Sequence, residues 1–156
     1  MAHVGHCQPR SRQLEKWHEA RKNPMKQEIP LRILIADDSA EWRVRIRSIL
    51  KTRPELQVIG EAGDGLDAVH TTTALRPDIV LLDIGMPVLN GVEAAKQIRP
   101  RSPSSRIVFL TQENDEEIRT AALAAGAEGY VLKANAGSEL LPAIEAACSP
   151  EVASPA

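Results

Sequence analysis

The chain has 156 residues, a formal net charge of −2 at pH 7 and a hydrophobic fraction of 43%. This length allows one domain with a sizeable core but not two ordinary ones, and the hydrophobic fraction excludes a chain that is disordered throughout. The small negative charge argues against a general nucleic-acid-binding or membrane-binding surface.

Residues 1–30 differ from the rest of the chain, because they carry six basic and three acidic side chains whereas acidic residues predominate afterwards. We predict an N-terminal extension that is mostly flexible, within which Ser11–Asn23 has the pattern of a helix ended by Pro24. A basic docking arm is the alternative interpretation. Residues 149–156 are expected to form a C-terminal tail.

No apolar run is long enough to span a membrane, and the first residues lack the apolar core of a signal peptide. Cys7 and Cys148 lie near opposite ends without the spacing of metal ligands, which indicates reduced thiols rather than a disulfide framework. We therefore expect a cytoplasmic protein that does not contact a membrane.

The first predicted strand, Leu31–Ala36, runs into the polar stretch Asp37–Ser39. A helix should follow to about Thr52, since apolar residues recur on one face at i, i+4, i+7 and i+8: Trp42, Ile46, Ile49 and Leu50. A short second strand is expected over Gln57–Gly60. Asp64 then caps the second helix, which should carry Leu66, Val69 and His70 on or near its buried side.

The central feature is the run Ile79–Leu82, which continues without a polar residue into Asp83. An uninterrupted apolar run is typical of a strand buried on both faces of a parallel sheet. Gly85 and Pro87 end it. Asp83 should therefore lie at the carboxyl end of a central strand, where open α/β sheets bind their ligands.

The remaining elements repeat this alternation. Asn90 and Glu93 form a capping box for the third helix, and Asn114 with Glu117 form another for the fourth. Pro100 and Pro103 bracket a predicted loop, and a strand over Ile107–Leu110 follows and ends at Thr111. Gly126 is expected to end the fourth helix, after which a strand over Tyr130–Leu132 ends at Lys133. The last helix is expected over Ala136–Cys148, with a kink or late start at Pro142.

Five strands, each followed by a helix, predict a doubly wound α/β fold over residues 31–148. We expect a five-stranded parallel sheet in the flavodoxin-like order 2-1-3-4-5, with helices on both faces and a crevice between strands 1 and 3.

This order would bring five polar side chains to one edge of the sheet: Asp37, Asp38, Asp83, Thr111 and Lys133. Three carboxylates repel each other unless a divalent cation lies among them, and oxygen ligands favour Mg²⁺ or Mn²⁺. A hydroxyl and an ammonium group opposite them suit a phosphoryl group on or next to Asp83. Taken singly, each residue also has an ordinary structural interpretation, such as a helix cap or a solvated side chain.

Several stretches together resemble the receiver domains of two-component response regulators, the CheY-like family. They are Ile33–Ser39, Val80–Pro87, Asn90-Gly91, Phe109–Thr111 and Gly126–Lys133, and the resemblance covers about residues 31–148. The ending Gly-Tyr-Val-Leu-Lys is similar to the LuxR/FixJ-type subgroup, whose receivers usually precede a helix-turn-helix domain.

The resemblance implies that Asp83 is the phosphoacceptor and attacks a phosphohistidine of a sensor kinase or a phosphotransfer protein. Asp38, Asp83 and the backbone carbonyl of Gly85 would bind Mg²⁺, and Asp37 would act through a bound water. Lys133 would pair with the phosphoryl group.

The resemblance further implies a switch pair, Thr111 and Tyr130, and possible homodimerisation through the fourth helix, fifth strand and fifth helix. Such a protein is not an enzyme beyond its own phosphorylation and slow autodephosphorylation. Two departures from the family stand next to the site: Gln112 where a small residue is usual, and Ala134 where proline is frequent.

Other functions remain open at this point. A Mg²⁺-dependent phosphatase would use Asp83 as nucleophile, although related hydrolases carry a second Asp where this chain has Gly85. A receiver-like scaffold and a receiver fragment of a DNA-binding transcriptional regulator are further alternatives. The chain itself is not expected to bind nucleic acid directly.

Overall fold

The computed structural model of the chain describes residue 15 and residues 29–148. Its centre is a parallel sheet in the order β2-β1-β3-β4-β5, which confirms the predicted fold class. The strands are β1 (Leu31–Ala36), β2 (Leu56–Ala62), β3 (Ile79–Leu82), β4 (Arg106–Thr111) and β5 (Gly129–Leu132). The predictions for residues 1–28 and 149–156 lie, apart from residue 15, outside the described residues.

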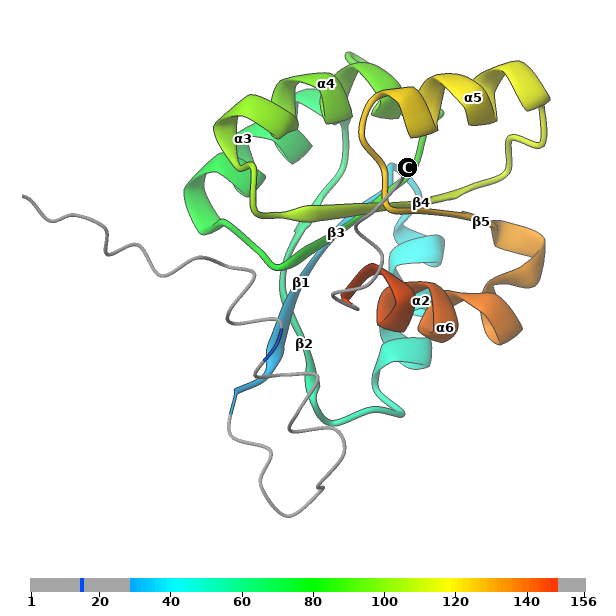
Figure 1. The fold of residues 1–156 in the computed structure, drawn as a ribbon. Coiled ribbons are helices and arrows are strands. Elements are labelled where there is room, and N and C mark those ends of the chain that lie inside the picture. The colour runs from blue at the N-terminus through cyan, green and yellow to red at the C-terminus, as the bar shows by residue number, and fades with distance from the viewer. Residues whose placement is uncertain (1–14, 16–28, 149–156) are drawn as a thin grey trace, which may run out of the picture.

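Helices cover both faces of the sheet. They are α2 (Ala40–Leu50), α3 (Gly65–Leu75), α4 (Gly91–Arg101), α5 (Glu116–Ala124) and α6 (Ala136–Cys148), with a short 3₁₀ helix, η2 (Lys133–Asn135), before the last. Figure 1 shows α3, α4 and α5 above the sheet and α2 and α6 below it. Among the described residues, none of the helices is long and apolar enough to cross a membrane.

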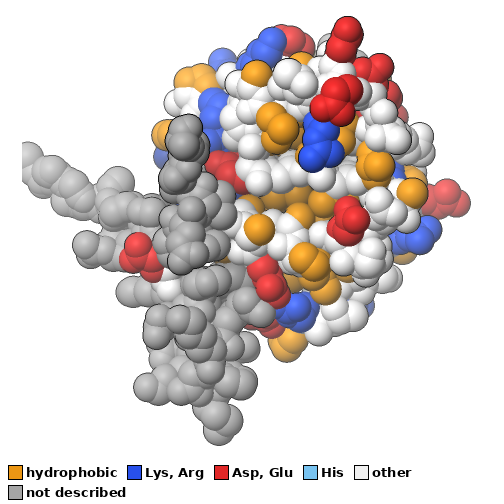
Figure 2. All heavy atoms as spheres, turned by 45° about the vertical axis from the view of Figure 1, so that its right-hand side comes forward, with side chains coloured by type: hydrophobic (Ala, Val, Ile, Leu, Met, Phe, Trp, Pro, Cys, Tyr) orange, Lys and Arg blue, Asp and Glu red, His pale blue; other side chains and the backbone are white. Residues whose placement is uncertain are grey.

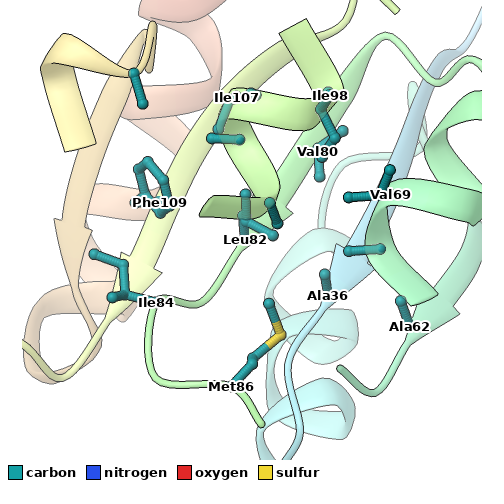
Figure 3. Packing of buried hydrophobic residues seen from close by; sticks show 14 of the residues in the cluster. Ala36, Ala62, Val69, Val80, Leu82, Ile84, Met86, Ile98, Ile107 and Phe109 are labelled. Carbon is teal, nitrogen blue, oxygen red and sulfur yellow. The ribbon is translucent and has the colours of Figure 1, made fainter. Parts of the chain in front are cut away.

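The sheet divides the core into two clusters. Alternate residues of β1, such as Ile33 and Ile35, pack toward α2 and α6, while Leu34 and Ala36 pack toward α3 and α4. Figure 3 shows the second cluster, where Val80 of β3 lies beside Ile98 of α4 and Leu82 belongs to the same cluster. All four residues of β3 are buried, as expected for a strand covered on both sides.

Three of the predicted helix starts are confirmed by their caps. The Ser39 hydroxyl accepts a hydrogen bond from the Trp42 amide at the start of α2, and the Asp64 and Asn90 side chains cap α3 and α4 in the same way. The expected cap of α5 was wrong by one residue. Asp115, not Asn114, accepts bonds from the amides of Glu117 and Ile118; both residue types cap well, so composition alone does not separate them.

The structure also corrects two expectations about proline. Pro100 lies inside α4 rather than in a loop, and α6 runs through Pro142 from Ala136, so its start is not late. Proline fixes φ near the helical value, but inside a helix it removes one hydrogen bond and its ring crowds the carbonyl four residues earlier. In α6 the buried stripe of Leu140, Ile144 and Ala147 offsets that cost.

The buried side of α3 is narrower than predicted. Val69 is buried, but Leu66 is 42% exposed and His70 is exposed as well. Ala68 and Thr72 occupy the packed face instead. Small side chains there let α3 lie close to the sheet, whereas the periodicity of large apolar residues predicted a broader face.

The edge strand β2 contains a bulge. Ile33 pairs with Val58, whereas the next residue, Leu34, pairs with Gly60, so that Ile59 is an extra residue in β2. Beyond the bulge, Glu61 lies opposite Ile35 and forms ion pairs with Arg43 and Arg47 of α2. Its hydrogen bond with Arg47 is the main cause that holds the pKa of Glu61 below its usual value.

Candidate phosphorylation and metal site

The predicted site residues meet at the carboxyl edge of the sheet. Asp37 follows β1, Asp83 follows β3, Thr111 ends β4 and Lys133 follows β5. Backbone hydrogen bonds fix the first two, because the Asp37 amide donates to the Ala62 carbonyl and the Asp83 amide donates to the Ala36 carbonyl, both at 3.0 Å. The topology therefore delivers each side chain to one place.

A cavity of about 430 Å³ opens at this edge. It is lined by Asp38, Ser39, Glu41, Trp42, Asp83, Gly85, Thr111, Gln112, Glu113 and Lys133. Of these, Glu41 was not singled out from the sequence. It precedes Trp42 in the first turn of α2, and its nearness to the strand ends follows only from the fold.

Three carboxylates face one ammonium group in this site. Asp37, Asp38 and Asp83 each offer an oxygen atom, and these atoms lie within 4.8 Å of one another. Lys133 is 5% exposed, and its Nζ lies 2.8 Å from Asp37 Oδ2 and 3.3 Å from Asp83 Oδ2. One cation does not balance three carboxylates, so the site carries excess negative charge.

The oxygens differ in their bonding. Asp37 Oδ1 accepts a hydrogen bond from the Ser39 amide, and Asp83 Oδ1 accepts one from the Ile84 amide. Asp37 Oδ2 is buried and meets Lys133 only as an ion pair, without hydrogen-bond geometry to any described residue. A buried carboxylate oxygen in this state, beside two further carboxylates, fits a hard divalent cation such as Mg²⁺.

The environment also affects the ionisation of Asp83. Burial raises the pKa of its carboxyl above the usual value, and the negative charge of Asp37 raises this pKa further. Lys133 acts in the opposite direction through its charge and its hydrogen bond. The ammonium group therefore favours the ionised form of the Asp83 carboxyl.

The two predicted switch residues are joined through one backbone residue. The Thr111 hydroxyl accepts a hydrogen bond from the Glu113 amide at 3.2 Å, and the Tyr130 hydroxyl donates to the Glu113 carbonyl at 2.7 Å. The centroid of the Tyr130 ring lies 6.3 Å from that of Phe109 and 5.3 Å from the guanidinium carbon of Arg119. The residue that links the pair, Glu113, was not predicted to do so.

The two departures from the family pattern lie beside the site. Gln112 is exposed and lines the cavity. The next residue, Glu113, has its carboxylate near Gly85: a Cβ atom built on Gly85 would lie 3.8 Å from Glu113 Oε2. The described part of the chain has no cis peptide bond, so the bond between Lys133 and Ala134 is trans.

Comparison with known proteins agrees with this geometry. Residues 33–145 match the family model of the response regulator receiver domain. The chain is 36% identical over 128 residues to the nitrate/nitrite response regulator NarL of Escherichia coli strain K12, and the match covers 82% of this chain and 59% of NarL. It thus spans about three fifths of the length of that curated relative.

Solved structures of similar fold extend the comparison. A LuxR-family two-component response regulator from Aurantimonas sp. SI85-9A1 gives a TM-score of 0.73 at 34% identity, covering 80% of this chain and 93% of that one. CheY in the CheX–CheY–BeF₃–Mg²⁺ complex of Borrelia burgdorferi gives 0.70 at 26% identity, covering 74% and 87%.

Proposed function

The chain belongs to the response regulator receiver family, and we propose that Asp83 is the residue that accepts a phosphoryl group in this protein. The proposed receiver domain comprises residues 31–148. Its proposed donor is a phosphohistidine of a sensor kinase or a phosphotransfer protein, and we expect the reaction to occur in the cytoplasm. The observation that carries the proposal is the position of Asp83 at the cavity, with Lys133 at 3.3 Å and two further carboxylates beside it.

In the proposed reaction, an ionised oxygen of Asp83 forms a bond to phosphorus while the phosphorus–nitrogen bond of phosphohistidine breaks. The electron pair of that bond returns to the imidazole. Lys133 then balances one phosphoryl oxygen, and the Thr111 hydroxyl donates a hydrogen bond to another. Both side chains already line the cavity beside Asp83, where they can contact the oxygens of the transferred phosphoryl group.

The proposed metal ligands are Asp38, Asp83 and the Gly85 carbonyl, with Asp37 acting through water. When bound, Mg²⁺ or Mn²⁺ neutralises charge on the carboxylates and the phosphoryl oxygens. The acidic cluster and the incompletely bonded Asp37 Oδ2 support this assignment, as does the Mg²⁺ named in the CheY complex of Borrelia burgdorferi. In a calorimetric Mg²⁺ titration, Asp38→Ala should lose more affinity than Asp37→Ala; the reverse order would exchange the two roles.

We propose that phosphorylation acts through Thr111 and Tyr130 on the surface of α5, β5 and α6. Both residues bond the backbone of Glu113, so a shift of Thr111 toward a phosphoryl group alters the segment that holds Tyr130. Figure 2 shows hydrophobic side chains across the middle of the face that it brings forward, and Leu123 of α5 is 45% exposed. The proposed partner for this surface is a second copy of the chain.

The test is phosphorylation with acetyl phosphate and Mg²⁺, followed by intact mass. The wild-type protein should gain one phosphoryl group, whereas Asp83→Asn should gain none. Asp115→Asn is the matched control, because asparagine also caps a helix and the residue lies at the start of α5. An equal gain of mass in Asp83→Asn would overturn the assignment.

A further inference from the structure

Three groups enclose the ammonium group of Lys133. Asp37 and Asp83 hold it by ion pairs at 2.8 and 3.3 Å, and the indole ring of Trp42 covers it, with 4.9 Å between Nζ and the ring centroid. Lys133 is 5% exposed. A lysine side chain has several rotatable bonds, so this arrangement requires that it be held in place.

Trp42 is itself anchored by its backbone and by packing against the core. It lies in the first turn of α2, where its amide donates to the capping hydroxyl of Ser39 at 3.2 Å. Its ring packs against the core cluster under α2 and α6 and also lines the cavity. The indole thus forms one wall of the site and is packed against the core on its other side.

The face of an indole ring attracts a cation more strongly than that of any other aromatic side chain, and more so where water is excluded. At this position the attraction holds the Lys133 ammonium group against the indole wall of the cavity, within ion-pair distance of Asp83. A second cation, the guanidinium group of Arg45, lies 5.0 Å from the same centroid, but Arg45 is exposed. Lys133 is therefore the partner that Trp42 restrains inside the cavity.

We propose that Trp42 is a positioning residue for phosphoryl transfer, which holds the Lys133 ammonium group where an oxygen of the incoming phosphoryl group will lie. This inference rests on the proposed function of Asp83. Trp42 does not touch the reacting atoms in this proposal; it acts through Lys133.

The experiment compares Trp42→Leu with Trp42→Phe. Leucine keeps an apolar side chain but removes the ring face, whereas phenylalanine retains a ring. The rate of phosphorylation by acetyl phosphate at saturating Mg²⁺ should fall by about fivefold to thirtyfold in Trp42→Leu, the range from an exposed to a desolvated cation–π contact, and less than about twofold in Trp42→Phe. Val44→Ala, on the exposed side of α2 at 64% exposure, should leave the rate unchanged.

Urea midpoints and calorimetric Mg²⁺ affinities of the variants separate positioning from folding. Positioning predicts that Mg²⁺ affinity is retained in Trp42→Leu while the rate falls. Equal rates in Trp42→Leu and wild type, or equal losses in Trp42→Leu and Trp42→Phe, would overturn the inference. If wild-type protein itself gains no phosphoryl group on Asp83, the proposed function fails instead.

A spectroscopic measurement gives an independent test. The chain contains two tryptophans, so Trp17→Phe leaves Trp42 as the only one that emits. Adding Lys133→Met removes the ammonium group at similar size and should change the emission intensity or maximum of Trp42 without any ligand present. Identical emission spectra, with and without Lys133→Met, would show that the ring does not sense Lys133.

Discussion

The start of α4 is packed so closely on the backbone just after β3 that Gly91→Ala should disturb both stability and the proposed phosphorylation of Asp83. A Cβ atom on Gly91 would lie 2.0 Å from the Asp83 carbonyl oxygen and 2.7 Å from Ile84 Cα. The Gly91 amide also donates to the Ile84 carbonyl at 2.8 Å. These neighbours are backbone atoms, which cannot rotate away as a side chain would.

The cost follows from this geometry. Cβ contacts below 3.0 Å are essentially never seen, so the start of α4 would have to move by about 1 Å. Overpacking of this kind costs about 3 kcal/mol where the neighbours cannot relax. Alanine regains up to about 1 kcal/mol of helix propensity, so we expect a net loss of about 2 kcal/mol in the free energy of unfolding.

Urea unfolding of Gly91→Ala and of Gly137→Ala checks this value. Gly137 lies in α6, and a Cβ atom added there would meet nothing within 4 Å, so alanine should stabilise by about 0.5–1 kcal/mol. The displacement of Asp83 in Gly91→Ala should also lower the rate of phosphorylation by about tenfold or more. Wild-type stability in Gly91→Ala, or the same change in both variants, would show that the close backbone contact does not limit this site.

Three single residues support further predictions. Gln112 lines the cavity, and we expect its side chain to shield a phosphoryl group there from water, so Gln112→Ala should lose phosphate about tenfold faster than wild type once acetyl phosphate is removed at constant Mg²⁺; an equal or slower decay contradicts this. Val88 is β-branched, 74% exposed and has a left-handed φ of 70°, which favours asparagine. In urea unfolding, Val88→Asn should therefore stabilise the protein by about 1 kcal/mol, whereas Val44→Asn on α2 should not stabilise it. Glu61→Gln should lower the free energy of unfolding by about 1 kcal/mol at pH 7. Because Arg47 lowers the folded-state pKa of Glu61, this loss should shrink as the pH falls below about 4.5. A loss that does not vary with pH would contradict the prediction.

Much of the site was predictable because its residues stand at or just after the carboxyl ends of strands, and a parallel sheet places these ends at one edge. Asp83 follows an uninterrupted buried strand, and Thr111 and Lys133 follow two others. Strand order then determines that these ends meet, so no knowledge of side-chain packing was needed. In the same way Asn90 was predictable as a cap, because the capping residue directly precedes the apolar pattern of its helix.

The features that escaped prediction depend on contacts between elements. Helical periodicity assigned Trp42 to the apolar face of α2, which is correct, but did not reveal that its ring also covers Lys133. The backbone of Glu113 links Thr111 and Tyr130 through two hydrogen bonds, which depend on the path of the loop and leave no pattern in the sequence. The alternative of a late start at Pro142 was wrong, because burial of the opposite side of α6 outweighs the low helix propensity of proline.

The extra residue in β2 also determines where this strand tolerates a deletion. If the pairing of β1 with β2 continued without the bulge, Glu61 would lie opposite Ala36. Its side chain would then point to the face of the sheet that packs against α3, away from the arginines of α2. Deletion of Ile59 itself leaves Glu61 opposite Ile35, so both faces of the strand keep their side chains. Deletion of Gly60 would instead bring the Ile59 side chain to a position where even a Cβ atom lies 3.2 Å from Leu75 Cδ1. A homologous strand that is one residue shorter should therefore lack the equivalent of Ile59 and retain the glycine after it.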